Sequence, residues 1–140
     1  MSHSEPMTSR ERIRSGLLGL PTDRTPLHCR LRMVPLTPEC QWIRDLGWGV
    51  VGGHPTFAVA PDGDMTLPEA GAAWPGRVIS LNFPSKFHHV NEEVIRAATQ
   101  RYVAEAPQTG GLLISLTEDF PKSCERKLFT TIAEAVQEMS

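Results

Sequence analysis

Two adjacent carboxylates, Glu118 and Asp119, directly follow an apolar run at residues 112–116. Such a pair can perform general acid–base catalysis, because burial or mutual repulsion raises the pKa of one of the two groups. The alternative is structural: Asp119 or Thr117 caps the turn and Glu118 faces water, as charged turn residues usually do. Glu118 and Asp119 are therefore the candidate catalytic residues, with turn capping as the competing interpretation.

Two arginines, Arg30 and Arg32, stand two positions apart in an alternating segment at residues 27–33. In a β-strand successive side chains point to opposite faces, so the spacing predicts that both guanidinium groups share one face. Paired guanidinium groups can bind a carboxylate through bidentate hydrogen bonds. We therefore predict that Arg30 and Arg32 bind a small anionic molecule.

A third group of polar residues follows the apolar run at residues 78–81. Asn82, Ser85 and His88 are the candidate substrate-binding residues in this group. His88 and the histidine after it could bind an anion or a metal ion, although adjacent loop histidines also commonly face solvent or enter a helix. Both interpretations stay open at this point.

The three cysteines, Cys29, Cys40 and Cys124, are widely and irregularly spaced, and the sequence contains no CxxC motif. His28 and Cys29 are neighbours on a predicted strand, so their side chains point to opposite faces and do not form a ligand pair. We expect reduced thiols, no metal site and no cofactor.

The helices that would position these groups are predicted by capping residues and by apolar periodicity. Capping boxes at Thr8 with Glu11 and at Thr66 with Glu69 each begin a helix, and residues 37–39 begin a short helix that ends at Gly47. Two longer helices follow, the first beginning at Asn91. Their predicted buried stripes are Val94, Ile95, Ala98, Tyr102 and Val103 in the first, and Leu128, Ile132, Ala135, Val136 and Met139 in the second.

Strands are predicted at residues 27–33, 48–51, 56–59, 78–81 and 112–116. The last two are nearly continuous apolar runs, which is typical of strands covered on both faces. Their alternation with helices predicts an α/β fold in which residues 78–81 and 112–116 are parallel neighbours. In such folds catalytic groups gather beyond the carboxyl ends of the strands, where both candidate segments stand.

The composition limits the partners. The chain has 140 residues, with 14 Lys and Arg against 16 Asp and Glu, and its formal charge is -2. This balance argues against nucleic acid or an anionic membrane as a partner bound through bulk charge. No stretch approaches the roughly 20 apolar residues of a membrane span, and the polar start lacks the core of a secretory signal. We expect a single domain at residues 1–140 and a cytoplasmic location.

Several segments resemble the uroporphyrinogen decarboxylase-like superfamily, which includes corrinoid-linked methyltransferases. The segments at residues 7–12 and 23–26 look like the opening of that family. Its closing segments are similar to residues 81–85, His88 and 111–121, and the stretch just before them is similar to residues 61–67 and Trp74–Pro75.

This resemblance implies a (β/α)₈ barrel, a fold that typically needs about 250 residues. Residues 1–59 resemble the beginning of the family and residues 60–140 its end, so we expect a partial TIM-barrel-like fold whose central units are missing. An open parallel sheet has unpaired edges and uncovered apolar faces. We therefore expect self-association into a homo-oligomer, with a refilled compact sandwich or poor solubility as the alternatives.

The family implies either decarboxylation of carboxylated tetrapyrroles or methyl transfer from corrinoids. Arg30 and Arg32 fall near its carboxylate-binding arginine-rich stretch without reproducing the glycine-containing motif, and residues 117–119 replace the decarboxylases' histidine. Two hypotheses follow. In the first, Arg30 and Arg32 bind the anion and Glu118 or Asp119 transfers protons; in the second, the chain is a catalytically inactive remnant that serves as a binding or assembly module.

Overall fold

The computed structural model describes residues 6–30, 38–51, 57–58, 63, 65–107, 110–116 and 120–140, and only the backbone of residues 28–30, 40, 44, 49–51 and 57–58. Its centre is one sheet of five parallel strands in the order β2-β1-β5-β4-β3. The strands are β1 (Leu27–Arg30), β2 (Trp48–Val51), β3 (Phe57–Ala58), β4 (Ile79–Asn82) and β5 (Leu112–Leu116). The fold is therefore α/β, as predicted.

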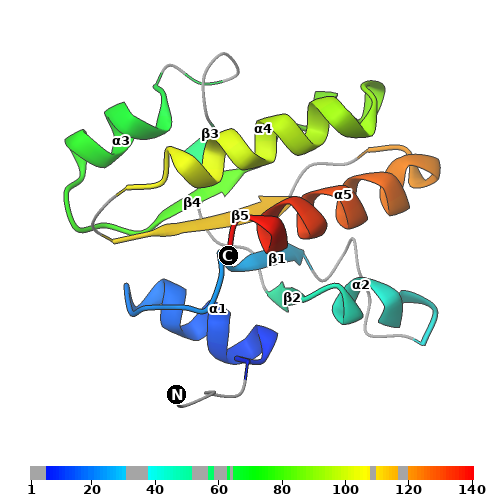
Figure 1. Cartoon of the computed structure of the whole chain (residues 1–140), viewed down its shortest axis with the longest axis horizontal. Helices are drawn as coiled ribbons and strands as arrows, with labels where there is room; N and C mark the ends of the chain where they lie inside the picture. Colours follow the sequence, from blue (N-terminus) through cyan, green and yellow to red (C-terminus); the bar gives the residue numbers. More distant parts are fainter. Residues whose placement is uncertain are drawn as a thin grey trace.

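Five α-helices and three short 3₁₀ turns connect and cover the described strands. The helices are α1 (Ser9–Leu17), α2 (Gln41–Asp45), α3 (Leu67–Ala73), α4 (Glu92–Ala104) and α5 (Glu125–Glu138), and the turns are η1 (Pro38–Cys40), η2 (Ser85–His89) and η3 (Lys122–Cys124). Figure 1 shows α4 and α5 side by side along the sheet, whereas α1 lies apart from α4, below β1 in that view. Among the described helices, none is both long and apolar enough to cross a membrane.

The core forms where α4 and α5 cover one face of the sheet. Strand register aligns Trp48, Leu27, Ile114 and Leu81 in one row across four strands, and all four side chains are buried. The Trp48 indole Nε1 donates a hydrogen bond to the Phe129 carbonyl oxygen at 3.0 Å, which ties an outer strand to α5. Burial of this continuous apolar row is the main force holding the helices on the sheet.

Helix α1 contacts the sheet through a different residue set. A Cβ atom added to Gly16 would lie 2.8 Å from Pro26 Cγ and 3.1 Å from Leu113 Cδ1, so the absence of a side chain permits this close approach. Leu113 alternates along β5 with Leu112 and Ile114, which belong to the core under α4 and α5. Both faces of β5 are thus covered, which explains why all five of its residues are buried.

The predicted helix starts are confirmed. Thr8 and Thr66 each accept a hydrogen bond from the backbone three residues later in a complete capping box, and Asn91 caps α4 through Val94 N. Two predicted core positions are wrong: Val94 is 45% exposed in the first turn of α4, and Met139 is 43% exposed just beyond the end of α5. Val94 shares one side of α4 with the exposed residues Ala97 and Arg101, so that side faces solvent, and Met139 stands just beyond the last residue of α5.

The strand predictions hold with small shifts of boundary. Strands β4 and β5 are parallel neighbours, as predicted for residues 78–81 and 112–116. The predicted strand at 27–33 is seen as β1 up to Arg30, and residues 31–33 lie outside the described part of the chain. Within the strand expected at 56–59, residues 57–58 form β3, and residues 56 and 59 lie outside the described part of the chain.

Candidate functional site

The carboxyl ends of three neighbouring strands define the candidate site. In the sheet β5 lies between β1 and β4, with Cys29 aligned to Leu116 and Asn82 aligned to Ser115. Because all three strands are parallel and end at nearly the same level, the segments that follow them leave the sheet at one edge. In parallel sheets this carboxyl edge is where binding sites form.

The structure describes some of the candidate residues and not others. Arg30 is the last residue of β1, so its backbone stands at the carboxyl edge, but its side chain lies outside the described part. Arg32, Glu118 and Asp119 also lie outside it. Their predicted roles therefore stay predictions, whereas Asn82, Ser85 and His88 can be placed.

Asn82 on β4 and Ser115 on β5 are two buried polar residues that stand opposite each other in the strand register. Their exposed fractions are 8% and 0%. The Ser115 Oγ donates a hydrogen bond of 2.8 Å to the Leu81 carbonyl oxygen, so this hydroxyl serves the sheet itself. Strand alternation turns both residues away from the face covered by α4 and α5.

Aromatic packing anchors the segment that follows β4. Phe83 is fully buried, and its ring centroid lies 5.1 Å from that of Phe87 and 5.6 Å from that of Tyr102. Its backbone N–H donates to the Ser115 carbonyl oxygen at 2.7 Å, which continues the pairing beyond the end of β4. The turn η2 therefore begins from a fixed point at the carboxyl edge.

Within η2, the imidazole of His88 is tied to the backbone. His88 Nδ1 lies 2.6 Å from the Ser85 carbonyl oxygen. A carbonyl oxygen can only accept, so Nδ1 carries a hydrogen and Nε2 is the ring nitrogen left for a ligand. The His89 ring lies against it, with centroids 3.7 Å apart. Ser85 thus contributes its carbonyl group to the local geometry, and substrate binding by its hydroxyl stays a prediction.

Lys127 of α5 is a residue of this site that the sequence pattern did not reveal. Its Nζ donates hydrogen bonds to the carbonyl oxygens of His88 at 2.9 Å and Val90 at 2.8 Å. The two partners are 39 and 37 residues away along the chain. The sequence feature that could have indicated its role is its position in the first turn of a predicted helix, where the helix dipole disfavours a positive charge.

The charge of this segment suits an anion. Residues 83–90 include Lys86, His88 and His89 and contain no carboxylate, and Lys127 adds a further cation from α5. Among the described residues no group of three His, Cys, Asp or Glu side chains could hold a metal ion, and Cys124 is a free thiol. The described chemistry at this edge is therefore hydrogen bonding and positive charge.

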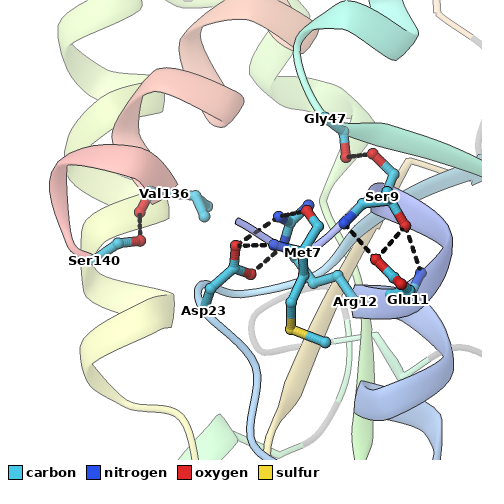
Figure 2. Close-up of polar contacts among 9 residues, drawn as sticks. Met7, Ser9, Glu11, Arg12, Asp23, Gly47, Val136 and Ser140 are labelled. Atoms are coloured by element: carbon cyan, nitrogen blue, oxygen red, sulfur yellow. Dashed lines mark hydrogen bonds and ion pairs between the residues drawn. The ribbon is translucent and has the colours of Figure 1, made fainter. Parts of the chain in front are cut away.

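A second polar cluster lies where α1 meets the turn before β1 (Figure 2). Arg12 binds both carboxylate oxygens of Asp23, with Nε–Oδ1 at 2.5 Å and Nη2–Oδ2 at 2.8 Å, and also donates to the Met7 carbonyl oxygen. The Met7 N–H donates to Asp23 Oδ2 at 3.1 Å. The hydrogen bonds from Arg12 lower the pKa of Asp23 against the opposing effect of burial. These groups satisfy one another, so the cluster is a structural clasp.

Comparisons with protein-family models, with curated proteins and with solved structures find no match for this chain. The similarity to the uroporphyrinogen decarboxylase-like superfamily thus stays a prediction from the motifs. The clasp nevertheless joins the two opening motifs on which that prediction rests, since Arg12 belongs to residues 7–12 and Asp23 to residues 23–26.

Proposed function

We propose that the protein is a shortened uroporphyrinogen decarboxylase-like protein, a partial barrel that binds a small carboxylated molecule at the carboxyl edge of its sheet. The observation that carries this proposal is the strand order. The last strand of the chain, β5, pairs in parallel with the first strand, β1.

This order supports a segment of a barrel. Written from one edge, the sheet reads β3-β4-β5-β1-β2, so sequence order is broken once, between the last strand and the first. Both β3-β4-β5 and β1-β2 advance in the same direction across the sheet. A doubly wound sheet reverses direction at its switch point, whereas a (β/α) barrel keeps one direction and brings its last strand beside its first.

The length of the link between β2 and β3 supports curvature. These strands are at opposite edges, four strand spacings or roughly 19 Å apart in a flat sheet, and Phe57 is level with Trp48, about 10 Å back along the strands from Val51. Residues 52–56 can span about 21 Å when fully extended. A flat sheet would therefore need a link that is almost fully extended, and a curved sheet, whose edges lie closer together, would relieve this requirement.

The proposed ligand chemistry follows from the charges at the edge. Arg30 and Arg32 bind carboxylates of the ligand together with Asn82, Ser85 and His88. In a decarboxylation the carbon that loses carbon dioxide must take up a proton, and Glu118 or Asp119 supplies it. By family resemblance the substrate is a carboxylated tetrapyrrole, with corrinoid-dependent methyl transfer as the second choice.

Binding is tested with propane-1,2,3-tricarboxylate and its uncharged triamide by titration calorimetry, and with uroporphyrin by fluorescence. We expect the tricarboxylate to bind at least about tenfold more tightly than the triamide, since charge-assisted hydrogen bonds are worth about 1.5–3 kcal/mol. Arg30→Ala and His88→Ala should each weaken binding about tenfold. Lys122→Ala, at an exposed position of η3, is the matched control. Equal affinity for the triamide would exclude the proposed carboxylate site.

Turnover is tested with the reduced tetrapyrrole under anaerobic conditions, with release of carbon dioxide as the readout. The enzyme hypothesis expects turnover that Glu118→Gln or Asp119→Asn abolishes. Binding without turnover supports the alternative of a catalytically inactive binding module.

An assembly role is the second candidate, and an apolar patch favours it. Leu17, Leu18 and Leu20 at the end of α1 are 54%, 64% and 54% exposed. Leu17 and Leu18 border a hollow of about 460 Å³ that Val78 and Ser80 also line. Clustered exposed leucines are typical of an interaction surface, which fits the expected homo-oligomer.

A further inference from the structure

We infer that Lys127 is a positioning residue that fixes the backbone of η2, so that the Nδ1–H of His88 stays on the Ser85 carbonyl and a protonated Nε2 donates to a carboxylate of the ligand. The effect on the imidazole follows from the geometry alone. Only the effect on ligand affinity rests on the proposed function.

The first support is the placement of the ammonium group. Lys127 Nζ bridges the carbonyl oxygens of His88 and Val90, at the carboxyl end of η2 and at the approach to α4. Carbonyl groups at the end of a helical turn have no partner within the turn, and a cation is their favourable partner. The side chain therefore joins α5 to the end of the histidine-bearing segment.

The second support is that the position of Lys127 is unfavourable unless its ammonium group makes specific contacts. Lys127 lies in the first turn of α5, where the dipole opposes a cation, and fixing a lysine side chain costs rotamer entropy. A lysine with no specific contact would extend into solvent. The partly buried position with two carbonyl partners indicates that these hydrogen bonds offset the cost.

The consequence for His88 follows from its own contact. With its carbonyl held by Lys127 and its Nδ1 bound to the Ser85 carbonyl, the residue is fixed at both its backbone and its ring. The neutral imidazole is thereby held as the tautomer with hydrogen on Nδ1. Without Lys127 the turn loosens, the Ser85 contact weakens, and the usual exchange between the two tautomers returns.

The experiment compares Lys127→Met with Arg96→Met by ¹⁵N NMR of the histidine rings, at a pH where the imidazoles are neutral. Arg96 is the matched control because it also joins α5 to a neighbouring segment through two acceptors, Glu134 at 2.9 Å and Glu138, neither of which belongs to η2. We expect the wild type and Arg96→Met to show a protonated Nδ1 and an unprotonated Nε2 in His88. Lys127→Met should show averaged shifts for the two nitrogens, and Lys127→Arg should restore separate ones.

Persistence of the fixed tautomer in Lys127→Met overturns the inference, whatever happens to stability. If Lys127→Met does not fold, Lys127→Gln replaces it, because one amide group replaces the ammonium between the two carbonyls and partial averaging is then expected. Affinity for propane-1,2,3-tricarboxylate should fall about tenfold in Lys127→Met and less than twofold in Arg96→Met. If the tautomer changes while neither Lys127→Met nor His88→Ala alters affinity, the positioning role stands and the proposed function fails.

Discussion

Arg12 and Asp23 form a bidentate ion pair between α1 and the turn before β1, and the two partners are unequally buried. The Arg12 side chain is 3% exposed, whereas that of Asp23 is 31% exposed. Since a charge without its partner is costly only where water cannot reach it, the two halves of the pair should respond differently to mutation.

Asp23→Ala should therefore destabilise the protein more than Arg12→Met. Removal of the carboxylate leaves a buried guanidinium whose remaining partner among the described residues is the Met7 carbonyl, which should cost about 3 kcal/mol. Removal of the arginine leaves a carboxylate that water can partly solvate, at a cost of about 1–2 kcal/mol. Urea unfolding monitored by circular dichroism measures both values, and a reversed order would contradict the burial argument.

The same pair predicts a dependence of stability on pH. The pKa of Asp23 is lowered in the folded protein, chiefly by the hydrogen bonds from Arg12, and by the positive charges of Arg12 and Arg24. The unfolded chain, with an aspartate pKa of about 3.9, therefore binds this proton more tightly than the folded one. The contribution to stability is present above the unfolded pKa and is lost as the pH falls through the folded pKa.

The wild type should accordingly lose more unfolding free energy between about pH 5 and pH 2 than Asp23→Asn does. Glu11 and Glu69 also have lowered pKa values because of their capping boxes, and they are present in both proteins. The difference between the two pH profiles isolates Asp23. Parallel profiles would contradict a pKa of Asp23 that is lowered by Arg12 in the folded protein.

Two adjacent glycines before β5 predict very different costs for the same substitution. Gly110 and Gly111 have φ angles of 94° and 90°, but a Cβ on Gly110 would lie 2.1 Å from the Arg77 carbonyl oxygen, whereas one on Gly111 meets nothing within 4 Å. Gly111→Ala should cost about 1–2 kcal/mol of backbone strain. Gly110→Ala should cost at least about 2 kcal/mol more, because backbone must move. Similar melting temperatures for the two variants would contradict the structure at this position.

The leucine patch predicts self-association that a charge can prevent. Sedimentation velocity of the wild type should show an oligomer that Leu18→Asp shifts to monomer, since a buried aspartate at an interface is unpaired. Val94→Asp, at a similarly exposed apolar position on α4, is the control and should leave the oligomer intact. A wild type that stays monomeric at high concentration would remove the assembly candidate.

Local structure was largely predictable because it depends on neighbours along the chain. Each capping box joins residues three apart, so Thr8 with Glu11 and Thr66 with Glu69 could be recognised by spacing alone. The apolar runs gave β4 and β5 to within a residue, and their alternation with helices gave the α/β class. Errors such as Val94 and Met139 occurred because periodicity contains no information about what lies opposite a residue.

By itself the sequence determined which segments are helices or strands, that the sheet is parallel, and that cationic residues follow β4. Only the tertiary structure decided that β5 lies between β1 and β4, that Arg12 binds Asp23, and that Lys127 reaches the carbonyl of His88. Capping and periodicity act over a few residues, whereas these contacts join residues 11 to 39 positions apart or strands from opposite ends of the chain. Such contacts form only when burial of the whole apolar core compensates the entropy of closing the loops between them.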